Sequence, residues 1–429
     1  MNTSTPADDD ALPPVRVKRP ERHQIQWRDA ALDQMIPSDV WAYVDSLNLK
    51  PLYRKIRAVE GRAGRDAVDP KILMALWMFA IIEGVGSARQ LARLCERDLA
   101  YKWICGDVGV NHHLLSDFRV DHGEFLDQLL TDTIATLMHQ KLVTLETVAQ
   151  DGMRVRANAG SSSFRRRESL EACRAEAAEQ VDKLRRENAD ETATNASEER
   201  RRAAAERAAK ERQERVKAAL ENLAELQEQK EERKKGSGEN ARCSTTDPEA
   251  RTMKMGDGGF RPAYNVQFAT DGDTRLIVAV DVTNNGSDAG QMAPMHTRVQ
   301  TAYGHAPRDY LVDGGFATIE DITQVEQAGS RVGAPMNYDE RISRRGGDPH
   351  ARRARDTDEM AEFRRRMATD EAKTIYRQRP SIAEFPNAEC RNRGLRQFPV
   401  RGLEKVRAVT LWYALAFNFL RMRTLKIIG

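Results

Sequence analysis

The hydrophobic and polar positions follow two different periods along the chain. From Pro37 to about Gln140 the apolar residues recur at helical spacing. Within this stretch, Asp69 and Pro70 form a cap and first turn ahead of an apolar run over 72–81. The run predicts a central helix that is buried on most sides. Shorter helices separated by Gly and Asp follow it, as in a helix-turn-helix bundle.

Basic side chains recur on these predicted short helices. They are Arg89, Arg93, Arg97 and Lys102. Such a bundle can place a helix in a DNA groove, and it can equally serve for dimerisation or packing. The adjacent His112 and His113 point in different directions on a helix or a strand, so we interpret them as loop or cap residues rather than as a metal pair.

After Leu142 the period changes to two residues, which predicts a strand that carries Asp151. Phe164 to Lys235 is rich in Ala, Glu, Arg and Lys, has almost no aromatic residues and is interrupted near Asn195. This composition predicts a long antiparallel helical hairpin.

The strand pattern returns after the hairpin, at 263–269 and 276–282, with a turn between the two runs. A short apolar strand then delivers Asp313 at its end, and further helices follow up to about Lys426. Strand, hairpin, helix, strand, helix, strand, helix is the order of a ribonuclease H-like α/β domain, here interrupted after its first strand.

The predicted fold class is therefore α/β: a ribonuclease H-like catalytic domain with a long helical hairpin insertion, preceded by an all-α, helix-turn-helix-like domain. The expected segments are a disordered tail at 1–24, a helical DNA-binding domain at 25–140, the catalytic domain at 141–163 and 241–429, the hairpin insertion at 164–240 and a mobile basic insertion at 338–371.

Composition narrows the class of protein only slightly. The formal net charge is +3, so charge alone does not indicate nucleic-acid binding, although basic residues crowd the stretch from Arg391 to Arg407. The five cysteines are scattered without the spacing of a zinc site or a disulfide framework. No signal peptide is recognisable, and the longest apolar run, 72–82, is shorter than the roughly 20 residues of a membrane helix. We expect a cytoplasmic protein, associated with the nucleoid when bound to DNA.

Three carboxylates can serve metal-dependent phosphoryl transfer. Two Mg²⁺ ions about 4 Å apart can activate the nucleophile and stabilise the leaving oxygen, and Mg²⁺ prefers hard oxygen ligands. Asp151 and Asp313 lie on neighbouring strands and can share an ion, and the glycines beside them would let a DNA backbone approach. Mn²⁺ is the alternative ion.

The third acid must come from the C-terminal helices. Glu384 is chosen on geometry, since Arg391 lies seven residues further on and shares its helix face. Pro386 complicates the choice, because a proline there can mark the true helix start. Glu389 is the reserve candidate. Taken in isolation, each of the three acids is more commonly a turn or surface residue.

Several blocks of this sequence resemble bacterial insertion-sequence transposases of the DDE superfamily, in particular the eleven-eighty-two-like group. The resemblance runs from about Leu52 to Met422. Its blocks are SARQLARLCERDLAYKWICGDVGVNHHLLSDFR, QDGMRVRANAG, DPEARTMK, RPAYNVQFATD, YLVDGGF and YRQRPSIAEFPNAECRNRGLRQFPVRGLEKVRA.

The resemblance implies the following roles. Asp151, Asp313 and Glu384 match the catalytic, metal-binding acids, and Tyr376, Arg379 and Arg391 match the aromatic and basic DNA-binding positions that flank the glutamate. Two positions depart from the commoner form: Ala383 stands where many relatives have valine, and Arg391 where many have lysine. Lys254 is a further DNA-binding candidate, although an exposed loop lysine is the commoner case.

The leading hypothesis is a transposase that cuts and joins double-stranded DNA at the terminal inverted repeats of its own element. The expected partners are these repeats and the target DNA, with a homodimer as the assembly and no membrane. A catalytically decayed or domesticated transposase that only binds DNA is the alternative. A third hypothesis, a structural coiled-coil protein, is supported only by the predicted hairpin. We interpret that hairpin instead as an element that dimerises the protein or clamps DNA.

Overall fold

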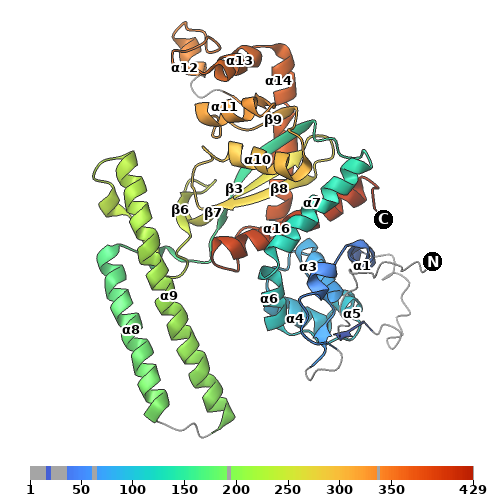
Figure 1. The fold of residues 1–429 in the computed structure, drawn as a ribbon, viewed down its shortest axis with the longest axis vertical. Helices are drawn as coiled ribbons and strands as arrows, with labels where there is room; N and C mark the ends of the chain where they lie inside the picture. Colours follow the sequence, from blue (N-terminus) through green and yellow to red (C-terminus); the bar gives the residue numbers. More distant parts are fainter. Residues whose placement is uncertain (1–15, 21–35, 60–64, 191–194, 336–338, 429) are drawn as a thin grey trace, which may run out of the picture.

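The computed structural model describes residues 16–20, 36–59, 65–190, 195–335 and 339–428. Its N-terminal part is a helical bundle (Figure 1). The helices are α1 (Ile36–Ser46), α2 (Lys50–Tyr53), α3 (Pro70–Ile82), α4 (Ala88–Arg97), α5 (Leu99–Cys105), α6 (His112–Val120) and α7 (Gly123–His139). A short parallel pair, β1 (Val17–Lys18) and β2 (Ala67–Val68), borders the bundle.

Helix α3 is the central helix that the apolar run predicts. The Asp69 side chain accepts a hydrogen bond from Lys71 N, and Pro70 occupies the first turn. Residues 72–81 are at most 5% exposed, which matches a helix that is apolar on most sides. Gly84, with φ +73°, follows the helix end. The Ser87 side chain caps α4 by accepting a hydrogen bond from Gln90 N.

The second part is built on one twisted sheet. Its strands are β3 (Thr147–Arg156), β6 (Arg251–Lys254), β7 (Phe260–Asp271), β8 (Ile277–Thr283), β9 (Asp309–Leu311) and β10 (Arg331–Gly333). The order is β10–β9–β3–β7, and both β6 and β8 pair with β7. Strands β10, β9 and β3 are parallel, whereas β7 is antiparallel to β3, β6 and β8.

Further helices complete this α/β part (Figure 1). They are α10 (Met292–Tyr303), α11 (Ile319–Gln327), α12 (Asp339–Arg344), α13 (Asp358–Met367), α14 (Asp370–Tyr376), α15 (Arg379–Asn392) and α16 (Leu403–Thr424). The sequence pattern predicts helices up to about Lys426 without locating the break between the last two. The structure has this break at 393–402, where Gly394 and Gly402 take positive φ values of +100° and +88°.

A helical hairpin follows β3 and projects away from the rest of the molecule (Figure 1). Helices α8 (Arg167–Asp190) and α9 (Ala196–Arg233) lie against each other. The Asn195 side chain caps α9 by accepting from Ser197 N and Glu198 N. Short segments join the hairpin to the sheet, namely η3 (Ser161–Ser163), β4 (Phe164–Arg165), η4 (Gly238–Asn240) and β5 (Cys243–Ser244). The hairpin is thus located where the sequence pattern predicts it.

Helix α16 joins the two parts of the molecule (Figure 1). It packs against α3, α6 and α7 and against strand β8, so a single hydrophobic cluster runs from Val40 to Phe419. The helices within 25–140 therefore share a hydrophobic core with the sheet. The reason is that α16 is apolar around its whole circumference and buries one side in each part.

Two other expected segments differ from the structure. Within the predicted tail 1–24, Val17–Lys18 pair with β2, and the residues at 1–15 and 21–24 lie outside the described part. The predicted mobile insertion 338–371 contains α13, which buries Met360, Phe363 and Met367 at helical spacing. The many arginines of this segment mask its apolar stripe in the sequence.

A buried polar network covers one face of β3 and β7. Gln150 Nε2 donates to Gln267 Oε1 at 2.9 Å. Asp288 closes the network, because its Oδ1 accepts from Asn265 Nδ2 at 2.7 Å and from Gln267 Nε2 at 2.9 Å. Its Oδ2 lies 2.8 Å from Arg154 Nη2. The hydrogen bonds and the ion pair together fix the face of the sheet opposite Asp151.

Gly152 is required by this network rather than by DNA. A Cβ at position 152 would lie 2.3 Å from Asp288 Oδ1 and 2.6 Å from Gln267 Nε2. Successive side chains alternate between the faces of a strand, so position 152 faces the network while Asp151 faces the other way. The expectation that Gly152 lets a DNA backbone approach is therefore wrong.

Replacement of Gly152 tests this packing. We expect Gly152→Ala to lower the free energy of unfolding by about 1–3 kcal/mol, because the added methyl group overpacks the network. Chemical denaturation measures the change. Gly256→Ala is the matched control, since a Cβ there has no heavy atom within 4 Å. Equal losses in the two variants would contradict the network's role.

Candidate active site

Strand pairing places two of the predicted acids side by side. In the parallel pair β3–β9, Ala149 is opposite Leu311. Asp151 and Asp313 each lie two residues beyond these positions, and neighbouring strands are about 5 Å apart. Asp151 is inside β3, whereas Asp313 follows the end of β9, where its Oδ1 accepts from Gly315 N at 2.7 Å.

One arginine lies among all three predicted acids. Arg379, the first residue of α15, donates from Nη2 to Asp151 Oδ1 at 2.8 Å. The same nitrogen lies 3.9 Å from Asp313 Oδ2, and Nη1 lies 3.5 Å from Glu384 Oε1. Arg379 is only 7% exposed. A buried guanidinium is thus the shared counter-ion of the three carboxylates.

The structure distinguishes Glu384 from the reserve candidate Glu389. Glu384 contacts Arg379, whereas Glu389 forms an ion pair with Arg393 one turn further along α15. Helix α15 begins at Arg379 and continues through Pro386, so the proline does not mark the helix start. Glu384 is therefore on the same continuous helix as Arg379, and only Glu384 of the two faces the other acids.

Asn387 is a member of the site that sequence analysis missed. It is 5% exposed, and its Nδ2 donates to Asp151 Oδ2 at 2.8 Å. Its Oδ1 is buried without a hydrogen-bond partner. The signal in the sequence was weak: Asn387 lies eight residues after Arg379 and three after Glu384, spacings that share a helix face.

The acids differ in burial. The side chain of Asp151 is 17% exposed, compared with 42% for Asp313 and 62% for Glu384. Burial raises the pKa of Asp151 to about 6, Arg379 acts in the opposite direction, and Asp313 raises the pKa further. The site is therefore buried at Asp151 and open to solvent at the other two acids.

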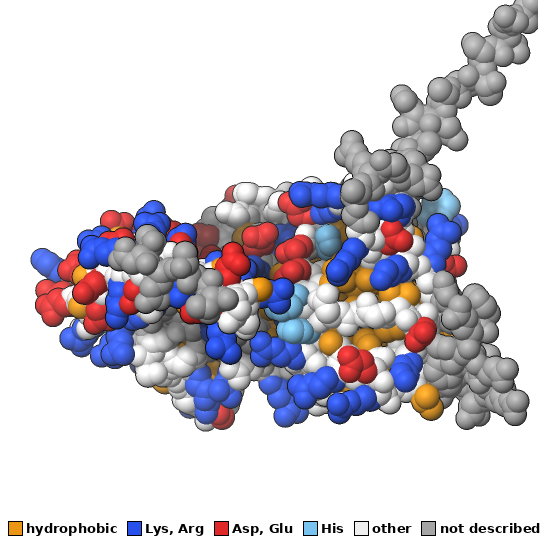
Figure 2. Space-filling model, turned by 90° about the horizontal axis from the view of Figure 1, so that it is seen from below, with side chains coloured by type: hydrophobic (Ala, Val, Ile, Leu, Met, Phe, Trp, Pro, Cys, Tyr) orange, Lys and Arg blue, Asp and Glu red, His pale blue; other side chains and the backbone are white. Residues whose placement is uncertain are grey.

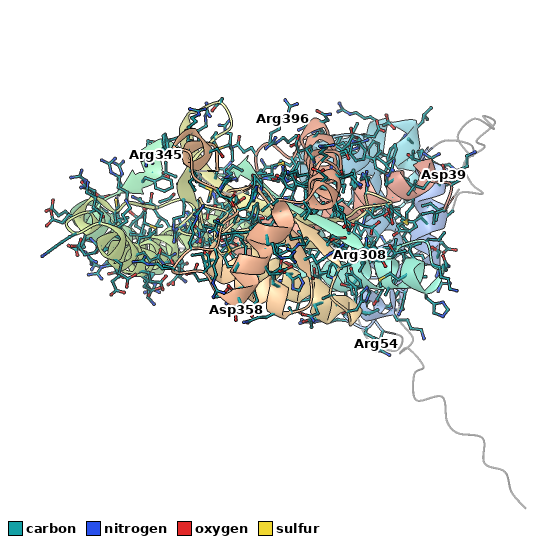
Figure 3. All side chains as sticks on the ribbon, turned by 90° about the horizontal axis from the view of Figure 1, so that it is seen from above. Asp39, Arg54, Arg308, Arg345, Asp358 and Arg396 are labelled. Atoms are coloured by element: carbon teal, nitrogen blue, oxygen red, sulfur yellow. The ribbon has the colours of Figure 1, made fainter. Side chains whose placement is uncertain are left out.

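The remaining DNA-binding candidates lie at different distances from this centre. Tyr376 is the last residue of α14. Burial raises its pKa, Arg379 lowers it, and Asp313, Asp151 and Glu384 raise it. Arg391 is exposed near the end of α15. Arg396, also exposed, lies at the periphery in Figure 3 and donates from Nε to Arg391 O.

Lys254 is not brought to the site. It pairs with Phe260 at one end of β7, whereas Asp151 pairs with Phe268. Eight residues of strand separate the two positions, which is about 27 Å at 3.4 Å per residue. Any contact of Lys254 with DNA would therefore be remote from the acids.

The donor set fits a divalent cation. Three carboxylates and the unpartnered Asn387 Oδ1 are hard oxygen ligands of the kind that Mg²⁺ and Mn²⁺ prefer. The described residues contain no group of three or more His, Cys, Asp or Glu side chains close enough to hold a metal ion together. The acids surround Arg379 instead, so a cation and this guanidinium compete for the same oxygens.

The raised pKa of Asp151 predicts a pH-dependent stability. The folded chain holds the Asp151 proton up to pH about 6 and the unfolded chain only to about 3.8, so ionisation costs stability as pH rises through this window. At pH 7 we expect metal-free Asp151→Asn to be more stable than the wild type, by at most about 3 kcal/mol in the free energy of unfolding. At pH 4 the two proteins should be equally stable.

The neutral amide is tolerated because Asn387 can turn its free Oδ1 toward position 151. Thermal unfolding in the presence of a chelator, at both pH values, measures the difference. A wild type more stable than the variant at pH 7 would show that the Arg379 ion pair outweighs burial.

Removal of the shared counter-ion should be costly. We expect Arg379→Met to lower the free energy of unfolding at pH 7 by about 3 kcal/mol, because Asp151 is left buried and unpaired. The loss should shrink at pH 4, where Asp151 is protonated. Arg393→Met is the control: it breaks the more exposed pair with Glu389, for which we expect less than about 1 kcal/mol. Equal losses would contradict the central place of Arg379.

Two family models match the chain. A Transposase domain (DUF772) matches residues 24–121, and a Transposase DDE domain matches residues 233–419. The second match includes Asp313, Arg379 and Glu384, whereas Asp151 lies between the two. No curated protein and no solved structure matches the chain. The two matches support an insertion-sequence transposase.

Proposed function

We propose that the protein is a DDE transposase of the eleven-eighty-two-like group that cuts DNA at the ends of its insertion sequence and joins them to target DNA. The observation that carries the proposal is the meeting of Asp151, Asp313 and Glu384 around Arg379. Asp151 lies in β3, Asp313 follows the end of the neighbouring strand β9, and Glu384 lies on helix α15.

The strand order supports a ribonuclease H-like catalytic domain. Strand β3 is central, with the antiparallel pair β7 and β8 on one side and the parallel strands β9 and β10 on the other. The hairpin α8–α9 then enters the chain between the first and second strands of this domain. We interpret it as an insertion because β4 and β5, which flank it, pair with each other, and β3 before it pairs with β7 after it.

Asp151, Asp313 and Glu384 would hold two divalent ions, Mg²⁺ or Mn²⁺. When bound, such ions activate the attacking oxygen, stabilise the leaving oxygen and neutralise the phosphate. The side chains of this protein prepare the place. Asn387 orients the Asp151 carboxylate by donating a hydrogen bond to its Oδ2. Arg379 balances the negative charge of the acids when no cation is bound.

The solvent-facing side of the site suits a DNA strand. Asp313 and Glu384 are the exposed members of the triad, so the scissile phosphate would approach past them to Asp151. Tyr376 precedes Glu384 at the end of α14, Arg391 follows it on α15, and both would contact that strand. A guanidinium that leaves the acids could itself turn to a phosphate oxygen, which would give Arg379 its DNA-binding role.

Strand cleavage by purified protein tests the proposal. The substrate is a DNA fragment that carries the gene with its flanking sequence on both sides, and the readout is nicking or joining on a denaturing gel with Mg²⁺ or Mn²⁺. We expect Asp151→Asn, Asp313→Asn and Glu384→Gln each to lower the cleavage rate by at least about 10³-fold, since each removes a charged metal ligand.

Glu389→Gln is the matched control and should retain wild-type cleavage, because Glu389 pairs with Arg393 away from the other acids. A Glu389→Gln variant that is inactive beside an active Glu384→Gln would exchange the two glutamates. Wild-type protein that binds the fragment but never cuts it would favour the DNA-binding alternative over the enzyme.

A further inference from the structure

A cationic pocket lies at the N-termini of two helices of the N-terminal bundle. Its volume is about 460 Å³, and it opens between α4, α6, the segment 393–402 and α16. The polar residues used below are Arg89, His112, His113, Arg119 and Tyr413. None of the described residues that line it is Asp or Glu. It is distinct from the acidic site, which α15 and the sheet form.

Arg119 is the central observation. It is 5% exposed, and its side chain donates a hydrogen bond from Nη1 to Gly86 O at 2.6 Å. Its Nε is buried without a partner, and its Cζ lies 4.9 Å from the centre of the Trp77 ring. No carboxylate of the described residues forms an ion pair with it. Burial lowers the pKa of Arg119 to about 10, as expected for a cation that lacks an anionic partner.

The N-termini of two helices, α4 and α6, line the pocket. Ala88 and Arg89 begin the ten-residue α4, and His112 and His113 begin the nine-residue α6. The capping side chains Ser87 and Asn111 bond only to later N–H groups, those of Gln90 and Leu114. The first N–H groups of both helices remain available to a ligand, and helix N-termini favour anions.

The pocket continues into a larger groove. A groove of about 1290 Å³ shares Arg89, Ser116 and Pro399 with the pocket and reaches the hairpin helix α9. Arg215 of α9 and Arg401 both line it, and burial, followed by the charge of Arg401, lowers the pKa of Arg215. Acidic residues line the groove as well. Figure 2 shows this underside, where basic, His and acidic side chains lie together between the hairpin and the bundle.

We propose that the pocket at Arg119 binds one phosphate of the DNA backbone and thereby anchors the duplex to the bundle. The ligand is anionic, because every charged lining group is basic and two helix N-termini converge on it. The continuation of the pocket into an open groove favours a phosphate within a long chain over an isolated ion. The proposal rests on the proposed function only in naming DNA as the polymer.

Binding without cleavage tests the pocket. Anisotropy of a short labelled duplex of random sequence is measured in a chelator over a range of salt concentrations. We expect Arg89→Ala and Arg119→Gln each to weaken binding about tenfold, because a hydrogen bond to a charged group is lost. The plot of log K against log salt has a negative slope, and its magnitude should decrease by about 0.9 in each variant. Arg89 is exposed, so its loss does not threaten folding.

Lys102→Ala is the matched control. Lys102 is exposed on α5, carries the same charge as Arg89 and does not line the pocket. The DNA affinity of the Lys102→Ala variant and its salt dependence should therefore equal those of the wild type. An equal fall in the Lys102→Ala variant would show a diffuse basic surface and overturn the pocket. Retained binding in both Arg89→Ala and a folded Arg119→Gln would overturn it too.

Inorganic phosphate separates the two sources of the anion. It should raise the melting temperature of the wild type and not of Arg119→Gln. Stabilisation by phosphate together with unchanged DNA affinity in the variants would assign the pocket to a free anion and overturn the DNA anchor. Since no metal is present, failure of this test leaves the cleavage result unaffected, and failure of cleavage leaves the anchor intact.

Discussion

Burial of helix α16 is the constraint on which the rest of the structure depends. Its side chains from Val409 to Phe419 are at most 5% exposed, because α3, α6 and α7 cover one side and the sheet covers the other. Asn418 fastens the helix to the edge strand: its Oδ1 accepts from Ile277 N and its Nδ2 donates to Ile277 O, both at 2.8 Å. Trp412 Nε1 donates to Arg119 O on the opposite side.

Both proposed sites follow from that burial. The segment 393–402 leads from α15 into α16, so the position of α16 sets where α15 crosses β3 and where Arg379 meets Asp151. The same segment and the α16 residues Val409 and Tyr413 form one wall of the pocket at Arg119. An acidic centre and a cationic pocket are thereby held in a fixed relation by one hydrophobic helix.

Charge is balanced differently in the two places. The three carboxylates would repel one another in a half-buried site, and Arg379 relieves the repulsion from within the protein. The guanidinium of Arg119 has no such partner among the described residues and has a carbonyl and an aromatic ring as neighbours. Three carboxylates around one arginine indicate a cationic ligand, whereas Arg119 without an anionic partner indicates an anionic one.

Much of the fold could be predicted from local patterns. Helix α3, the hairpin α8–α9 and strand β3 follow from apolar periods and capping residues that a few neighbouring positions determine. The strand placement of Asp151 and Asp313 follows in the same way. Local pattern does not specify which residues meet across α15, so Asn387 was missed and Glu384 could not be separated from Glu389.

The sequence by itself determined many of the elements and their order, and it supplied the carboxylates that we propose as catalytic. Only the tertiary structure decided that Arg379 lies among those acids, that Gly152 serves a buried network and that the bundle shares its core with the sheet. The physical reason is the range of the interactions. Helix and strand periods act over a few residues, whereas the contact from Arg379 to Asp151 joins positions 228 residues apart.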